Sequence, residues 1–174
     1  MRIESPSFTE QELRGFLDEV VSHERARLVD RLKAGSTRLA QLVARDPQRQ
    51  GDGQPGWTGH EVLAHIAVLS KFYGVVTYQV ASGKVSQVDL LHVVQDRDIA
   101  GEQLSSLPAD QLLAMAQQDH RRTIGFLGSA DATAMQRRAE LYNGVSLSAL
   151  EIASLALCAH LEIHLDQLER TLQP

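Results

Sequence analysis

Apolar residues recur at three- and four-residue steps along much of the chain, which is the spacing of amphipathic helices. The first such run holds Leu13, Phe16, Leu17, Val20, Val21, Leu28, Leu32, Leu39, Leu42 and Val43, with charged residues between them. Thr9 and Glu12 have the spacing of a capping box at its start, and Asp46-Pro47 ends it. The pattern predicts one long helix, with the Gly35-Ser36 pair as a candidate kink.

A loop and a second helix follow. Residues 45–56 are rich in glycine, proline and polar residues and predict a surface loop. Thr58 and Glu61 again have capping-box spacing, and the apolar pattern continues to about Ala81, where Ser82-Gly83 ends it. We therefore expect a second helix from Thr58 to Ala81.

The second half of the chain predicts two more main helices. Residues 85–103 are the least regular, and we expect a helix from Val88 to Gln103 that forms a lid or part of a dimer contact. Ser106 and Pro108 open a further helix that ends at Gly128. After a turn-rich stretch at residues 142–146, Ser148 and Glu151 cap a final helix that runs to about Leu172.

Together these elements predict an all-α fold. No segment has the alternating pattern of a convincing strand pair, and no internal repeat is evident. Four main helices favour an antiparallel four-helix bundle, with an extra helical segment between the second and third main helices. A length of 174 residues fits a single domain spanning residues 1–174.

Composition narrows the functional classes. The chain is 43% apolar and 22% charged, as is usual for a globular protein, and it has no apolar run of the roughly 18 residues that a spanning helix needs. The net charge of −5 is scattered and no basic stripe is present, so neither a membrane nor nucleic acid is an expected partner. The lone cysteine, Cys158, and the absence of a signal-peptide pattern favour the cytoplasm.

Three histidines fall on the apolar sides of two predicted helices. At about 100° per residue, His160 shares its side of the last helix with Ala153 and Leu157, and His164 lies about 40° away and one turn further on. In the second helix, His65 falls among Ile66, Leu69, Phe72, Tyr73 and Val76. All three are therefore expected to face the core.

Inward histidines on facing helices are a ligand set for a metal ion. Two imidazoles one turn apart can bind the same ion, and a third from another helix leaves one coordination position open, as in sites that do chemistry. A structural alternative remains, because a buried histidine is more often a hydrogen-bonded core residue than a ligand. Three imidazoles that each need a polar partner favour the shared cation, with His65, His160 and His164 as ligands.

Other candidate residues are weaker. Glu61 and Tyr73 are near enough in register to act as catalytic groups, although Glu61 is also the capping residue. Cys158 is expected to pack against a neighbour, and His60 to be a solvated residue at the helix start. The remaining histidines have polar neighbours and are expected at the surface; they are His23, His92 and His120.

The stretch "WTGHEVLAHIA", with Trp57 eight residues before His65, together with "HLEIH" near the C-terminus, resembles the DinB/YfiT-like superfamily of metal-binding four-helix bundles. That superfamily is similar to the N-terminal domain of mycothiol-dependent maleylpyruvate isomerase. The resemblance implies that His65, His160 and His164 bind a divalent ion, zinc or nickel, and that the chain forms a homodimer. Because the chain ends at Pro174, directly after the last helix, we do not expect it to share the isomerase reaction.

Two functional hypotheses follow from the resemblance. The first is a metal-dependent enzyme that joins a low-molecular-weight thiol such as mycothiol or bacillithiol to an electrophilic substrate; a metal-dependent hydrolase is a variant of it. The second is a non-enzymatic module that binds a metal or another ligand, or a dimeric bundle in which the histidines are only core residues. Fold class alone does not decide between them.

Overall fold

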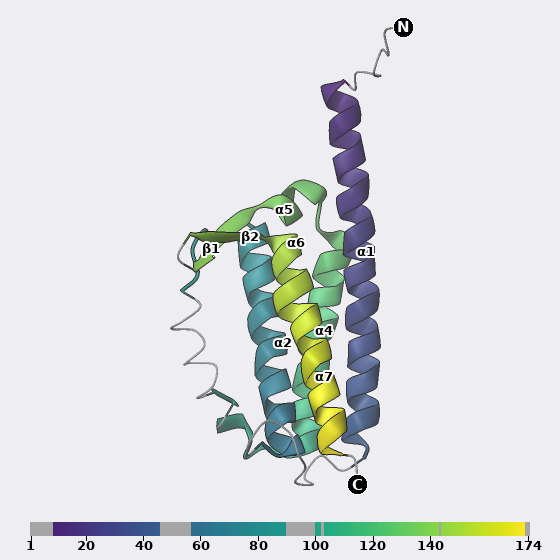
Figure 1. Cartoon of the computed structure of the whole chain (residues 1–174), viewed down its shortest axis with the longest axis vertical. Helices are drawn as coiled ribbons and strands as arrows, with labels where there is room; N and C mark the ends of the chain where they lie inside the picture. Colours follow the sequence, from purple (N-terminus) through teal and green to yellow (C-terminus); the bar gives the residue numbers. More distant parts are fainter. Residues whose placement is uncertain (1–8, 46–56, 90–99, 102, 143, 173–174) are drawn as a thin grey trace, which may run out of the picture.

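The computed structural model describes residues 9–45, 57–89, 100–101, 103–142 and 144–172. Its four long helical elements are α1 (Glu10–Val43), α2 (Gly59–Ala81), α4 (Ala109–Ser129) and a last element that ends in α7 (His160–Thr171). They pack side by side as a bundle (Figure 1). The all-α fold expected from the sequence is confirmed, with an interior made of leucine, isoleucine, valine and alanine side chains.

Helix starts follow the sequence closely. Capping boxes form at Thr9 with Glu12 for α1 and at Thr58 with Glu61 for α2. In each box the threonine side chain accepts a hydrogen bond from the backbone nitrogen of the glutamate, and the glutamate carboxylate accepts one from the backbone nitrogen of the threonine. A third box, at Ser148 with Glu151, opens α6 (Ala149–Glu151). Each box satisfies backbone donors that a helix start leaves unpaired, so these starts were predictable to the residue.

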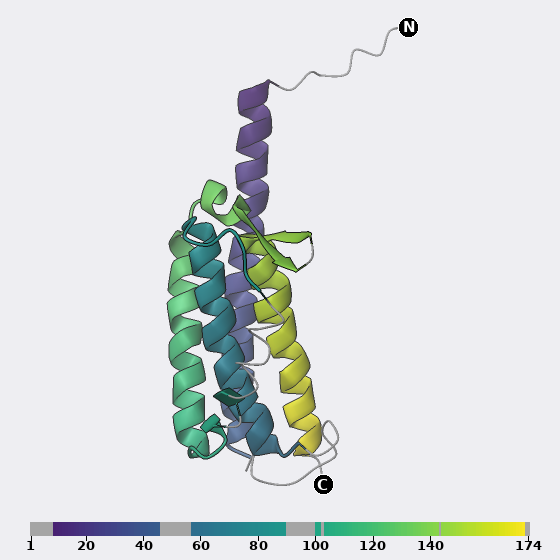
Figure 2. The same cartoon turned by 90° about the vertical axis from the view of Figure 1, so that its left-hand side faces the viewer.

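α1 is one continuous helix without a break at Gly35. The residue serves close packing instead: a Cβ at Gly35 would lie 2.9 Å from Cδ2 of Leu161. The N-terminal part of α1 extends beyond the other helices (Figures 1 and 2). Four residues of its apolar stripe are therefore exposed there: Leu13, Phe16, Leu17 and Val20, with 44–61% of their surface accessible.

α2 and α4 run in the same direction, which is an exception to the antiparallel order expected. Their first turns lie together, since Thr58 and Glu61 share a cavity with Ser106 and Pro108. α2 ends at one end of the bundle and α4 begins at the other (Figure 1). Most of the helix expected from Val88 to Gln103 lies outside the described residues, so its role as a lid or dimer contact stays a prediction. Val88 itself is outside any helix and donates from its backbone nitrogen to the carbonyl of Glu140.

A small antiparallel hairpin was missed by the sequence analysis. It follows α5 (Ala132–Gln136) and consists of β1 (Arg138–Tyr142) and β2 (Val145–Ser148), with Arg138 opposite Ser148. Alternate residues of β1 are buried, and Gly144 takes the positive φ of 84° that the turn requires. The strands were overlooked because five and four residues are too few for a clear alternating pattern.

The last helical element changes its winding. Between α6 and α7, residues Ile152–Ala159 form a π-helix (η1), in which hydrogen bonds span five residues. The wider winding rotates everything that follows relative to Ile152 and ends immediately before His160. Among the described residues, no helix is both long enough and apolar enough to cross a membrane.

Candidate metal centre

His65 of α2 and His160 and His164 of α7 come together in the bundle. One nitrogen from each ring lies within 4.8 Å of those of the other two. The ring centroids of His65 and His164 are 4.5 Å apart, those of His160 and His164 4.7 Å, and those of His65 and His160 6.3 Å. The convergence predicted from helical direction is therefore present, although no described contact shows that a metal is bound.

The donor set fits a divalent ion of the zinc type. Two nitrogens that each lie about 2.0–2.1 Å from one tetrahedral zinc ion are about 3.4 Å apart. Three nitrogens within 4.8 Å of one another would therefore move by on the order of 1 Å on binding. Rotation of two helical side chains supplies such a movement without a change of backbone. Neutral imidazole is a preferred ligand for zinc and nickel.

Burial differs among the three rings. His65 is 6% exposed, whereas His160 and His164 are half-buried. The indole of Trp57 lies edge-on against His65, with ring centroids 5.0 Å apart and planes at 70°. Tryptophan thus packs against the most buried of the three rings, while the two rings on α7 are partly exposed.

Gln167 is hydrogen-bonded to His164, a contact that the sequence analysis did not predict. Its Oε1 lies 2.8 Å from Nδ1 of His164, and Gln167 is only 3% exposed. When Nδ1 carries the proton and donates to this oxygen, the lone pair of His164 is on Nε2. Metal-bound histidines are commonly oriented by such a second hydrogen bond. The signal in the sequence was a polar residue one turn after His164, on the buried side of α7.

The two weak catalytic candidates have different surroundings. Tyr73 is 8% exposed, and its ring centroid lies 5.9 Å from that of His160, so it borders the cluster. Glu61 is exposed, and its carboxylate accepts a hydrogen bond of 2.6 Å from the backbone nitrogen of Thr58. The carboxylate of Glu61 is thus used in capping α2, as the sequence spacing suggested.

Cys158 packs in the core, as expected. It is 1% exposed, and burial raises the pKa of its thiol to about 11. The charges of Arg31 and Glu162 lie near it and act in opposite directions. These two residues form a two-bonded ion pair between α1 and α7, each bond 2.8 Å long. The thiol is therefore protonated at neutral pH and is not a nucleophile.

One histidine was misplaced by the sequence analysis. His120 was expected at the surface but is 1% exposed, with its Nε2 2.8 Å from Oγ of Ser70. Charged neighbours in the sequence obscured it. The signal that would have placed it is the apolar stripe of α4 to which it belongs, with Ala116 before it and Thr123 after it. His23 is exposed as expected, His60 is half-buried, and His92 lies outside the described residues.

The comparisons with known proteins support the fold. No protein-family model and no curated protein matches the chain. Among solved structures, the chain is similar to mycothiol-dependent maleylpyruvate isomerase, with a TM-score of 0.68 and 16% identity over 84% of this chain and 61% of the isomerase chain. A histidine-to-alanine variant of that isomerase gives a TM-score of 0.67 at the same identity and coverage.

The chain thus spans about three fifths of the length of the isomerase that it resembles. At this identity the likeness establishes the fold. The helical bundle expected from the sequence is therefore confirmed.

Proposed function

We propose that this chain, as one domain over residues 1–174, is a metal-dependent enzyme that transfers a low-molecular-weight thiol to an electrophilic substrate. His65, His160 and His164 would hold one divalent ion, zinc or nickel. The observation that carries the proposal is the convergence of these three rings from two helices. The mycothiol dependence of the structurally similar isomerase favours a thiol as the fourth ligand of the ion.

The three histidines supply neutral ligands and leave room for a further one. When bound, the ion would act as a Lewis acid that lowers the pKa of a coordinated thiol. Gln167 would keep Nε2 of His164 directed at the ion, and Trp57 would hold His65 in place and shield it from water.

The nucleophile must come from a second molecule. Cys158, the chain's single cysteine, is buried and protonated. In the proposed reaction the thiol loses its proton to solvent, and its sulfur forms a bond to one carbon of an activated double bond. The neighbouring carbon takes up a proton as the double bond is lost, so that nothing is oxidised or reduced.

Tyr73 is the better placed of the two candidate catalytic groups. Its ring borders His160, and its phenol is a suitable donor toward a substrate at the open side of the cluster. The carboxylate of Glu61 is engaged in the capping box of α2, which argues against a direct part in the reaction.

Two alternatives keep the same residues. In a hydrolase, a water molecule would replace the thiol as the fourth ligand and the histidines would keep their role. In a non-enzymatic module, the cluster would bind a metal or ligand without turnover. We favour the transferase because of the thiol dependence of the similar structure.

We also place the protein in the cytoplasm, where a lone cysteine stays reduced.

We further propose a homodimer built on α1. The protruding part of this helix carries Leu13, Phe16, Leu17 and Val20, all of them exposed. A short helical segment that packs against no other element is only marginally stable in water. A second copy of the chain packed against the same apolar stripe would therefore stabilise it.

A thiol-transfer assay tests the proposed activity. Untagged protein loaded with zinc or nickel is incubated with mycothiol, bacillithiol, glutathione or coenzyme A and a panel of activated alkenes. We expect loss of free thiol with one of the four thiols, absent in His160→Ala and retained in His23→Ala, which changes an exposed histidine. Metal-loaded protein that turns over no thiol but cleaves ester or amide substrates would favour the hydrolase. Metal binding without either activity would favour the binding module.

A further inference from the structure

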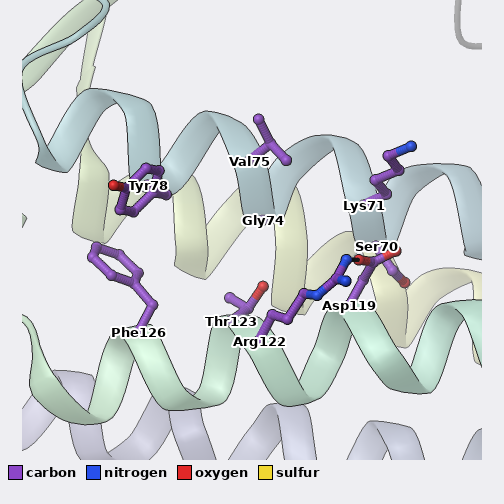
Figure 3. A pocket seen from close by; sticks show the side chains of 9 residues that line it. All are labelled: Ser70, Lys71, Gly74, Val75, Tyr78, Asp119, Arg122, Thr123 and Phe126. Carbon is purple, nitrogen blue, oxygen red and sulfur yellow. Dashed lines mark hydrogen bonds and ion pairs between the residues drawn. The ribbon is translucent and has the colours of Figure 1, made fainter.

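A second candidate site lies between α2 and α4. Here the two helices border a groove of ≈ 340 Å³, a volume within the range of small-molecule sites. Figure 3 shows its two ends: Tyr78 and Phe126 face each other at one, and Ser70, Asp119 and Arg122 gather at the other. Gly74 lies nine residues after His65, a rotation of about 180° around α2, so the groove opens on the face turned away from the histidine cluster.

The apolar end offers a surface for a flat ring. The rings of Tyr78 and Phe126 are 5.4 Å apart with planes at 84°. Tyr78 is 44% exposed and Phe126 is half-buried, so both present apolar surface to the groove. Lys84 adds its ammonium 5.0 Å from the centre of the Tyr78 ring, which favours a fixed position for that ring.

The polar end carries an excess of one positive charge. Arg122 donates to Asp119 over 3.1 Å, so these two charges offset each other. Lys71 stands at the rim of the groove and makes no hydrogen bond or ion pair with the part of the chain that the structure describes. A ligand with one negative charge would complement this end.

The floor beneath the polar end is built from buried polar groups. Ser70 is 2% exposed and donates to the carbonyl of Ile66, while its oxygen also lies 2.8 Å from Nε2 of His120. Nδ1 of His120 has no hydrogen-bond partner among the described residues. The two helices approach closely beside this floor, because a Cβ at Gly74 would lie 2.5 Å from Oγ1 of Thr123. The floor is therefore rigid.

We propose that this groove binds a small organic monoanion with one flat apolar ring, such as an aromatic carboxylate. The ring lies against Tyr78 and Phe126. The carboxylate accepts hydrogen bonds from Arg122 and, after rotation of its side chain, from Lys71. The proposal is independent of the metal centre and of thiol transfer.

Titrations of the isotope-labelled protein followed by NMR test the site. The probes are benzoate and phenylacetate, benzamide as a neutral ring, acetate as an anion without a ring, and phenyl phosphate as a dianion. We expect saturable shifts at residues 70–78 and 119–126 with the two ring monoanions. Benzamide and acetate should bind at least about tenfold more weakly, because each lacks one of the two matched features, and phenyl phosphate should bind no better than benzoate.

Variants on neighbouring positions provide the controls. Arg122→Gln should weaken benzoate binding at least about fivefold, as expected for loss of a charged partner. Arg121→Gln removes an adjacent exposed cation that does not line the groove and should leave binding unchanged. Phe126→Ala should weaken benzoate more than acetate.

His160→Ala tests whether benzoate binds at this groove or at the histidine cluster, since a carboxylate could also bind a metal at the cluster. Benzoate affinity should be the same in that variant. The proposal would be overturned if benzoate and benzamide bound equally, or if the Arg121 and Arg122 variants lost binding equally. Loss of binding in His160→Ala, or no saturable binding of either ring monoanion, would also overturn it.

Discussion

Oε1 of Gln167 lies 2.8 Å from Nδ1 of His164 and ties the histidine cluster to the buried side of α7. The contact matters because it determines which nitrogen of His164 carries the proton. With Nδ1 as the donor, Nε2 has the lone pair that a metal requires.

Gln167→Met should therefore weaken metal binding without unfolding the protein. The two side chains have similar size, so the core stays filled while the hydrogen-bond acceptor is lost. We expect the metal dissociation constant to rise about 10- to 100-fold, as measured by competition with a chelating dye. Gln118→Met, an exposed change on α4, is the control. Equal metal affinity in all three proteins would show that Gln167 only fills space.

His120 should make stability depend on pH. Burial lowers its pKa to about 4, from an ordinary value of 6.5. As pH falls through 6.5, His120 becomes protonated in the unfolded chain, whereas in the folded chain it becomes protonated only near pH 4. Folding stability contributed by this group is thus complete above pH 6.5 and is lost between pH 6.5 and 4, up to about 3 kcal/mol.

Urea denaturation of His120→Gln checks this dependence. The variant lacks the titrating group, so its midpoint should fall less between about pH 7 and pH 4.5 than that of the natural chain. His23→Gln changes an exposed histidine and should behave like the natural chain. If the His120 variant showed the same fall as the His23 variant, the buried histidine would not be the source.

Gly35 should be essential for the approach of α1 to α7. Gly35→Leu forces Leu161 to move, because even a Cβ would lie 2.9 Å from its Cδ2. We expect a loss of about 1–3 kcal/mol in the free energy of unfolding. Gly125→Leu is the matched helical control: it has open space around it and should stabilise α4 by up to about 1 kcal/mol. Similar stability of the two variants in urea would contradict the close packing.

The proposed dimer should depend on the protruding part of α1. Phe16→Lys places a charge in the exposed apolar stripe and should shift the protein toward monomer in sedimentation experiments. Val145→Lys, at an equally exposed apolar position on the hairpin, should not. A monomeric natural chain, or equal effects of the two changes, would remove α1 as the interface.

The sequence predicted those features that depend on local chemistry. Helix starts were located because Thr58 and Glu61, three residues apart, satisfy each other's backbone donors. His160 and His164 were placed together because one helical turn fixes their relative direction whatever precedes them. The π-helix over Ile152–Ala159 changes the direction of the preceding residues relative to His160. It does not change the direction of His160 relative to His164, because both lie in α7.

Features that depend on long-range packing were not predictable in the same way. The exposure of Phe16 follows from the length of the partner helices and not from its own amphipathic pattern. His120 was misplaced because Arg121 and Arg122 beside it are exposed, and one buried polar side chain among charges leaves little trace in the sequence. The parallel course of α2 and α4 depends on where the chain enters α4, which is the end of the bundle at which α2 also begins.

The most direct test of the account is the metal content of untagged protein, measured by mass spectrometry of the elements after purification without chelators. We expect close to one equivalent of zinc or nickel in the natural chain and in His23→Ala, and almost none in His160→Ala. A metal-free natural chain that also fails to take up zinc or nickel, or an unchanged metal content in His160→Ala, would contradict it.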